Sequence, residues 1–459
     1  KATPHQPDFG RPTRPSLGRS MDDAPSPSNA ATGAEASDER RHVNVMCADL
    51  FLSCLGLSFL LQARPQLALG LYGGDAARAS SRLATWTACA SCLEFILGPT
   101  AGGLADAFGR KPLLLASAAS NLLLRLGVVV NLGAWPVAFE KIMTSPLLTA
   151  GSVATSAAVA DLASGRRLAV CLAKVGISAA AAFIVGPASA GVLIKRRGPR
   201  AAYALGAAAA AAQLLLLCAR FRETLPPEQR RPAPGFVSPL SCARLVASPS
   251  RHLRTLTIVG LLQTFCEPKT WNDMVQLYMK VDVGLPVDRV GHFFAAFGAA
   301  AMLAKGMTAR IVMRSGAAFH TSLSNVAMVV AFFAWGVAPS SKVTSVVLPL
   351  ALAPLYLDHR AGVASRANDL AVEAGFGKGE FAALFGNLRA LGIIVGPLLF
   401  GRLYAWGRAE QRRQPGLGFW AAAFLALVAE VAHQTLPSEA REQPACKPKN
   451  ALTVRAVIS

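Results

Sequence analysis

Five ionisable residues interrupt long apolar segments of this chain, namely Asp49, Glu94, Arg125, Glu267 and Arg389. A charged side chain is costly in hydrocarbon, so such residues pair with one another or mark the path of a solute or an ion. A carboxylate removed from water favours its protonated form, which would let Asp49 or Glu94 take up and release a proton. An arginine keeps its charge, so Arg125 either pairs with an acid or binds an anionic group.

Asp49 and Glu94 each have a structural alternative. Asp49 lies about two turns from the expected start of its apolar segment, where it can serve a neighbouring helix end instead of transport. Glu94 lies deeper among apolar neighbours, and it either exchanges a proton or forms a buried ion pair with Arg125. The sequence leaves both interpretations of Glu94 open.

Three charges fall within seven residues at Glu267, Lys269 and Asp273, with Pro268 among them. A broken helix that lines a water-filled path would explain this cluster, because irregular backbone at membrane depth needs such surroundings. The alternative is that the helix ends here and that the three charges are exposed.

These residues belong to a chain that is too apolar for an ordinary soluble protein. Of its 459 residues, 53% are hydrophobic and 16% are charged, with a mean hydropathy of +0.40. Soluble domains carry about 25% charged residues. The formal net charge of +20 indicates Lys and Arg in loops that face anionic cytoplasmic lipid. No nucleic-acid recognition motif accompanies this charge, so we expect a lipid bilayer as partner and no nucleic acid.

Twelve apolar segments predict an all-α membrane protein with twelve transmembrane helices. They lie near residues 43–63, 80–104, 112–134, 142–163, 168–194, 200–220, 253–279, 288–309, 317–337, 343–358, 379–406 and 415–435. The longest polar stretch, a central cytoplasmic loop at 221–252, separates an N-terminal half at 43–220 from a C-terminal half at 253–435. We expect residues 1–42 to be a disordered cytoplasmic segment and residues 436–459 to be a cytoplasmic tail. Loop charges favour a multi-pass protein with both termini inside.

A short motif recurs in the two predicted halves. Ile-Val-Gly-Pro-x-x-x-Gly-x-Leu stands at 184–193 and again at 394–403, an offset of 210 residues. The pairs Gly186–Pro187 and Gly396–Pro397 each place a helix kink beside a position for close helix packing. The same motif in the fifth helix of each half predicts two pseudo-symmetric, parallel repeats.

Residues 103–111, Gly-Leu-Ala-Asp-Ala-Phe-Gly-Arg-Lys, form a short charged loop between two apolar segments. Together with residues 160–162, 223–226 and 378–404, this loop resembles the major facilitator superfamily, most closely its drug- and tetracycline-antiporter-like branch. The resemblance covers residues 43–435 and implies the two-halved, twelve-helix fold. It also implies that Arg389 faces the cavity and that the loop is a cytoplasmic latch, whose Asp and Arg pair across the halves in the outward-open state. The latch motif comprises Gly103, Asp106, Gly109, Arg110 and Lys111.

The resemblance and the buried charges together predict a secondary active transporter that moves a small organic solute by alternating access. Proton coupling through Asp49 or Glu94 is a weaker addition. The chain has no phosphate-binding loop and no catalytic motif, so we expect no enzyme, no cofactor and no metal, and a monomeric carrier driven by an ion gradient. The second copy of the loop, near Gly306 and Gly316, lacks an Asp. This leaves a second hypothesis, a transport-inactive receptor or structural membrane protein of the same fold.

Overall fold

The computed structural model describes residues 27–163, 165–230, 239–337, 346–409 and 414–437. It divides into two compact units, residues 1–41 and 42–459. The described part of the first unit, residues 27–41, is helical and begins α1 (Pro27–Leu71). The segment predicted to be disordered therefore overlaps a helix from residue 27, and residues 1–26 lie outside the described part. All contacts below lie within the second unit.

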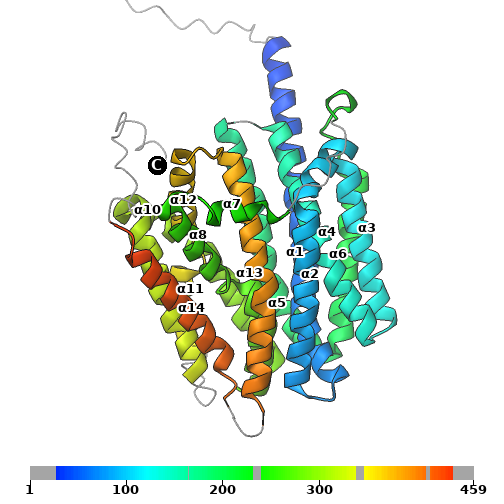
Figure 1. Cartoon of the computed structure of the whole chain (residues 1–459). Helices are drawn as coiled ribbons and strands as arrows, with labels where there is room; N and C mark the ends of the chain where they lie inside the picture. Colours follow the sequence, from blue (N-terminus) through cyan, green and yellow to red (C-terminus); the bar gives the residue numbers. More distant parts are fainter. Residues whose placement is uncertain (1–26, 164, 231–238, 338–345, 410–413, 438–459) are drawn as a thin grey trace, which may run out of the picture. The chain divides into compact units, whose positions relative to one another are not determined.

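Helices make up the regular secondary structure of the described ranges (Figure 1). We define the first helix group as α1, α2 (Ala76–Phe108), α3 (Arg110–Val130), α4 (Ala134–Leu162), α5 (Gly165–Arg197) and α6 (Pro199–Arg220). The second helix group is α8 (Arg251–Thr264), α9 (Pro268–Val281), α10 (Val287–Val337), α11 (Leu348–Tyr356), α12 (Arg360–Glu373), α13 (Lys378–Gly407) and α14 (Leu417–Gln434). The connection holds two 3₁₀ turns and one short helix: η1 (Pro227–Gln229), η2 (Pro239–Cys242) and α7 (Ala243–Val246).

Many of these helices are long and apolar enough to cross a membrane. Within the described residues eight helices meet that requirement, or nine if the bent α2 forms one span. The 51-residue α10 contains a kink at Gly316, whose φ of 86° is unfavourable for residues with a side chain. This kink lies between the predicted segments 288–309 and 317–337, which explains why two expected helices occur as one.

The tenth predicted segment, residues 343–358, is too short. It covers α11, but the helix resumes at Arg360 and α12 continues to Glu373. Asp358 and Arg360 interrupt the apolar pattern at this point. Hydropathy therefore ended the predicted segment before the helical region itself ends.

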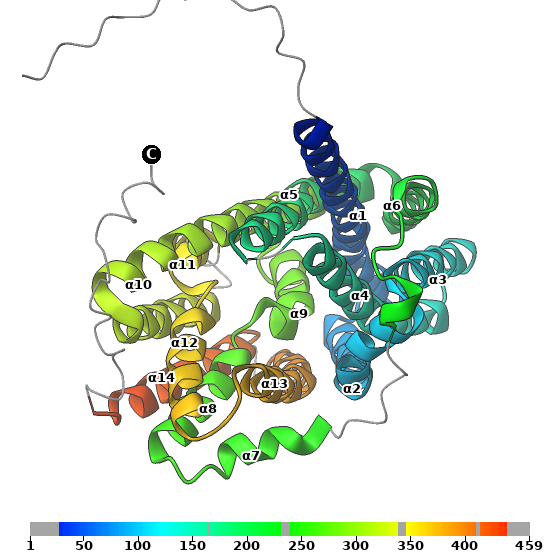
Figure 2. The same ribbon diagram turned by 90° about the horizontal axis from the view of Figure 1, so that it is seen from above.

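Buried apolar residues join the two helix groups at one end of the helices. The largest cluster combines the C-terminal part of α1 and the N-terminal parts of α2 and α4 with α9, α10, α11 and the C-terminal part of α13. We call this the α1–α2 end, after the turn that connects those helices. Trp271 on α9 lies at its centre, with ring centroids of Phe297 and Trp335 at 5.7 and 5.3 Å. Figure 2 shows α9 between the two groups, α5 beside α10, and α2 beside α13.

At the opposite end, where α2 meets α3, the apolar packing is divided. One cluster there contains residues of α1–α6 such as Met46 and Leu217, together with Phe221 after α6. Another contains only residues of α7, α8 and α12–α14 and the short segment after α14, including Leu253 and Phe385. Each group thus has an apolar core of its own at the α2–α3 end.

The glycines of the repeated motif lie at close helix contacts. A Cβ at Gly186 would collide with the Ser58 hydroxyl of α1, and a Cβ at Gly396 would lie 2.8 Å from Thr270 Cγ2 of α9. These first glycines pack inside their own helix group. Neighbouring Pro187 and Pro397 are interior to α5 and α13.

The second glycines of the motif pack between the groups. A Cβ at Gly191 of α5 would lie 2.9 Å from the Val287 carbonyl oxygen of α10. At Gly401 of α13 it would lie 2.5 Å from Ala84 Cβ of α2. Both crossings need a residue without a side chain, because backbone or Cβ atoms fill the space.

We expect Gly186→Leu and Gly396→Leu to lower the yield of folded protein, because overpacking costs about 1–3 kcal/mol. Gly176→Leu on α5 and Gly386→Leu on α13 are matched controls, since no atom of the described residues lies within 4 Å of a Cβ added at either position. Monodisperse yield and thermal midpoint in detergent measure the effect. Equal losses at packed and control positions would contradict the close-packing interpretation.

Candidate functional site

The chain breaks between α8 and α9, beside the predicted charge cluster. Pro268 occupies the first turn of α9, where its missing N–H does no harm. The Thr270 hydroxyl donates to the carbonyl oxygens of Phe265 and Glu267, both at 2.7 Å. Trp271 Nε1 donates to the Cys266 carbonyl oxygen at 2.9 Å. Side chains thus satisfy the carbonyls that the break releases, and the chain continues as α9 after the break, as in the broken-helix alternative.

One face of α9 carries polar side chains that contact the first helix group. Lys269, Asp273, Gln276 and Lys280 recur at helical spacing along this face. Lys269 pairs with Glu94, Asp273 with Lys141 and Thr87, Gln276 with the Leu61 carbonyl, and Lys280 with Gln66. The interface between the groups at α9 is therefore made of ion pairs and hydrogen bonds.

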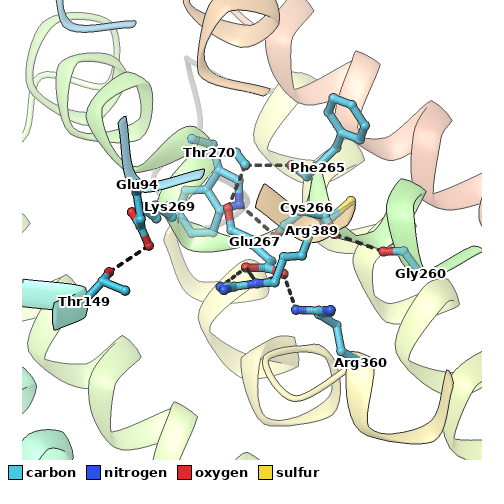
Figure 3. A network of polar contacts seen from close by, with 12 residues as sticks. Glu94, Thr149, Gly260, Phe265, Cys266, Glu267, Lys269, Thr270, Arg360 and Arg389 are labelled. Carbon is cyan, nitrogen blue, oxygen red and sulfur yellow. Dashed lines mark hydrogen bonds and ion pairs between the residues drawn. The ribbon is translucent and has the colours of Figure 1, made fainter. Parts of the chain in front are cut away.

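Glu94 accepts three contacts from two different helices. The Lys269 ammonium lies 2.5 Å from Oε2 and the Ser145 hydroxyl 2.6 Å from Oε2. The Thr149 hydroxyl lies 2.9 Å from Oε1 (Figure 3). Its cationic partner is Lys269 of α9, whereas the sequence analysis considered Arg125. The pair with Arg125 is not formed, because Arg125 donates to the Gly206 carbonyl oxygen instead.

Arg125 is 1% exposed and donates through Nη1 to the Gly206 carbonyl oxygen of α6 at 2.8 Å. It lies close to Gly56 of α1, where an added Cβ would collide with the guanidinium. A cation in this position holds α1, α3 and α6 together inside the first group. The contacts give it no access to the face that meets α9.

A buried ion pair was missed by the sequence analysis. Arg64 Nη2 of α1 lies 2.7 Å from Glu140 Oε1 of α4, and Tyr203 of α6 donates to the same carboxylate at 3.3 Å. Both charged residues fall just outside the predicted apolar segments, which end at 63 and restart at 142. The helices α1 and α4 extend beyond the predicted apolar segments. If the predicted segments had been extended in the same way, Arg64, Glu140 and Lys141 would have been expected in the interior.

Glu267 binds two arginines of the second group. Arg389 Nε of α13 lies 2.8 Å from each carboxylate oxygen, and its Nη2 lies 2.5 Å from Oε2. Arg360 Nη1, at the start of α12, lies 3.3 Å from Oε1. Figure 3 shows both guanidinium groups directed at the one carboxylate. The structure therefore brings together two predicted site residues, Glu267 and Arg389, and adds Arg360.

Asp49 lies apart from this network. It is 2% exposed, and its carboxylate accepts from Gln213 Nε2 of α6 at 2.9 Å and from the Thr155 hydroxyl of α4 at 3.3 Å. These neutral donors belong to the first group and lie near the α2–α3 end. The contacts fit the structural alternative, in which Asp49 joins neighbouring helices.

A small pocket, with room for about one water molecule, lies between α2, α9 and α13. Its lining includes the charged residues Lys269 and Asp273, the hydroxyls of Ser80, Thr87 and Thr270, and the motif residues Pro397 and Gly401. Both helix groups contribute to it. The pocket therefore borders Lys269 and Asp273, which form ion pairs between the groups.

The charged loop between α2 and α3 finds its contacts inside the first group. Arg110 Nη1 lies 2.6 Å from Asp106 Oδ1, and its Nε lies 3.1 Å from Asp161 Oδ2 of α4. Glu223 accepts the backbone N–H groups of Arg110 and Lys111 at 2.9 and 3.0 Å, and so caps α3. Gly109, with φ of 100°, makes the turn, and Gly103 lies within the last turns of α2. These contacts hold the latch motif within one group.

A chain of apolar helices around a polar, two-group interior is the arrangement of a membrane transporter. Residues 47–365 match the family model of the Major Facilitator Superfamily, and the chain belongs to this superfamily. It is therefore a multi-pass integral membrane protein of a transporter family and not an enzyme.

Two curated proteins of this superfamily are similar to part of the chain. Over 171 residues the chain is 30% and 31% identical to the Major facilitator superfamily domain-containing protein 10 of Bos taurus and of Homo sapiens. These matches cover 34% of this chain and 35% of each relative, so the aligned region spans about a third of their length.

Solved structures share the fold over most of the chain. The human organic anion transporter MFSD10 has a TM-score of 0.61 at 22% identity, covering 86% of this chain and 99% of that one. The nucleoside transporter NupG has 0.65 at 14%, covering 85% and 98%. The D-xylose-proton symporter has 0.68 at 13%, covering 87% and 98%. At these identities the likeness concerns the fold alone.

We expect Glu94→Lys to destabilise the protein, because it places two ammonium groups together at the α2–α9 contact. Adding Lys269→Glu restores the pair with reversed polarity and should recover about 1–3 kcal/mol of coupling. Adding Lys305→Glu instead is the control, since Lys305 is exposed on α10. Thermal midpoints of the single and double variants give the coupling, and no difference between the two rescues would refute the pair.

We expect Asp106→Asn to slow transport while leaving membrane insertion intact. Asp106 is 42% exposed and is one of two carboxylates on Arg110, so the helix end stays held by Asp161 when it is neutralised. Asp75→Asn, which keeps the cap of α2 at the opposite end, is the control. Uptake rates are compared at equal surface abundance, and a wild-type rate for Asp106→Asn would remove the latch role.

Proposed function

We propose that the protein is a secondary active transporter that moves a small organic anion by alternating access. The observation that carries this proposal is the charged interior at the α8–α9 break, where side chains of both helix groups meet beside a small pocket. Transporters of this kind bind their solute at a discontinuous helix between two bundles.

In this proposal the chain forms twelve spans in two pseudo-symmetric halves. α1–α6 supply six, while α8 with α9, the two parts of α10, α11 with α12, α13 and α14 supply six more. The repeated motif supports the symmetry, because its first glycine packs within a group and its second packs between the groups in both copies. Because the charged loop at residues 103–111 resembles theirs, we propose that the chain is related to the drug- and tetracycline-antiporter-like branch.

The conformation fits a carrier open at the α2–α3 end. Apolar packing unites the groups at the α1–α2 end and is divided at the other. The latch contacts also stay within one group. If both termini lie in the cytoplasm, as the loop charges favour, this is an inward-facing state of a monomeric carrier.

The balance of charged side chains in the site supports the proposal that the solute is an anion. Among the described residues, the ion pairs around the α8–α9 break bring four cations, Lys141, Lys269, Arg360 and Arg389, to three carboxylates, Glu94, Glu267 and Asp273, and Lys280 on the same face of α9 contacts only the neutral Gln66. Within these ion pairs one positive charge is thus left to be balanced. One structural neighbour is named an organic anion transporter, which agrees with this charge balance.

Transport by purified protein tests the proposal and separates it from a transport-inactive receptor. Proteoliposomes loaded with benzoate, benzenesulfonate or phenyl phosphate should show saturable counterflow of the same radiolabelled anion. Empty liposomes and benzamide, a neutral match for benzoate, are the controls. Failure of counterflow for every anion would overturn the proposed solute class.

We expect Glu94→Gln to abolish gradient-driven accumulation while exchange is retained, since Glu94 is the proposed proton-coupling residue. Its partner Lys269 binds it across the two groups, so protonation of Glu94 would release that contact. Accumulation and exchange are measured with and without a pH gradient at matched expression. Unchanged accumulation, or loss of both activities with folded protein, would contradict proton coupling at this residue.

A further inference from the structure

Glu267 is a single carboxylate that faces two cations. Two guanidinium groups, from Arg360 and Arg389, share this single carboxylate. The Glu267 side chain is 7% exposed, whereas that of Arg389 is 40% exposed and that of Arg360 24% exposed. A solute therefore has access to the arginines, while the carboxylate behind them is covered.

Arg360 has unused donor capacity. Its Nε is buried and has no hydrogen-bond partner among the described residues, although an arginine presents five N–H donors. Its guanidinium carbon lies over the Phe385 ring, 5.3 Å from the centroid, a favourable cation–π contact. A buried donor without a partner is costly, so the present arrangement of Arg360 is not its most stable one.

From this geometry we propose that the anionic group of the solute binds between Arg360 and Arg389 and takes the place of Glu267 on Arg389. The inference rests on the proposed transport of organic anions and assigns the residues that recognise the charge. Glu267 then acts as an internal competitor, which occupies the arginines when the solute is absent. No covalent step is involved.

The lysines of the site are less suited to this role. Lys141 and Lys269 each pair with one carboxylate across the two helix groups, so neither is in excess. A guanidinium also offers two parallel donors that match a carboxylate or sulfonate, whereas an ammonium is a point charge. The two arginines and Glu267 together carry one positive charge, which a monoanion neutralises and a dianion exceeds. The site should therefore prefer monoanions.

Competition predicts an unusual effect of removing an acid from the site. Glu267→Gln should lower the KM for benzoate roughly tenfold, because the solute no longer displaces a charge-assisted hydrogen bond. Arg389→Gln and Arg360→Gln should raise it by a similar factor. Arg389→Lys keeps the charge but loses the paired donors, so it should also raise KM. Arg402→Gln, an exposed arginine on the same helix as Arg389, is the control and should leave KM unchanged.

The full-length protein is assayed in two ways. Counterflow in proteoliposomes gives KM and the maximal rate for benzoate, benzenesulfonate and phenyl phosphate, and thermal stabilisation by the same compounds in detergent reports binding without transport. If Glu267→Gln does not fold, the three arginine variants still decide.

The outcomes separate the two proposals. If wild-type protein neither carries nor is stabilised by any of the anions, the organic-anion function itself fails. If wild-type protein carries benzoate, and the variants of Arg360 and Arg389 keep its KM and stabilisation, only the assignment of the arginines is overturned. Lower KM for Glu267→Gln with higher KM for both arginine variants is the expected result.

Discussion

Pairing of charges across the two helix groups is the constraint on which the interior depends. An unpaired charge removed from water is costly, so the buried Lys141 needs Asp273, and Glu94 pairs with the more exposed Lys269. Both pairs involve the same face of α9. The opposite face packs Trp271 and Tyr278 into an aromatic core. One helix thus contacts its own group by aromatic packing, and contacts the other group by ion pairs as well as by the apolar residues at the α1–α2 end.

The glycine motif has the complementary role of setting how closely the groups approach. Gly191 and Gly401 remove the side chains at the two crossings, α5 with α10 and α2 with α13. Polar pairs such as Lys141–Asp273 and Lys195–Asp288 can form only when those crossings are close. The close backbone contacts at the two glycine crossings fix the geometry of the closed end. The ion pairs determine how readily that end opens.

Sequence patterns predicted the class of fold well and the partners in the site poorly. Hydropathy identified the apolar helices and the repeat at 186 and 396 indicated the close-packed glycines, because these depend on local composition, while the charges beside Pro268 left a broken helix as one of two alternatives. Hydropathy failed at Arg64, Glu140 and Arg360, since a charged residue near a helix end looks like a loop until its partner is known. Glu94 shows the same limit. Its partner Lys269 is 175 residues away, and nothing in the local sequence distinguishes that lysine from Arg125.

The asymmetry between the two ends gives the proposed cycle a direction of coupling. At the α2–α3 end each group keeps a separate apolar core and Arg110 stays with its own helices, so closing that end needs contacts that are not yet made. At the α1–α2 end the polar contacts of α9 must first be released. A monoanion on Arg360 and Arg389 frees Glu267 beside the start of α9 and neutralises the excess positive charge of the site. A neutral interior is less costly to enclose than a charged one. Solute binding therefore favours the closure of the open end, and the same charge balance that selects the solute promotes the conformational change.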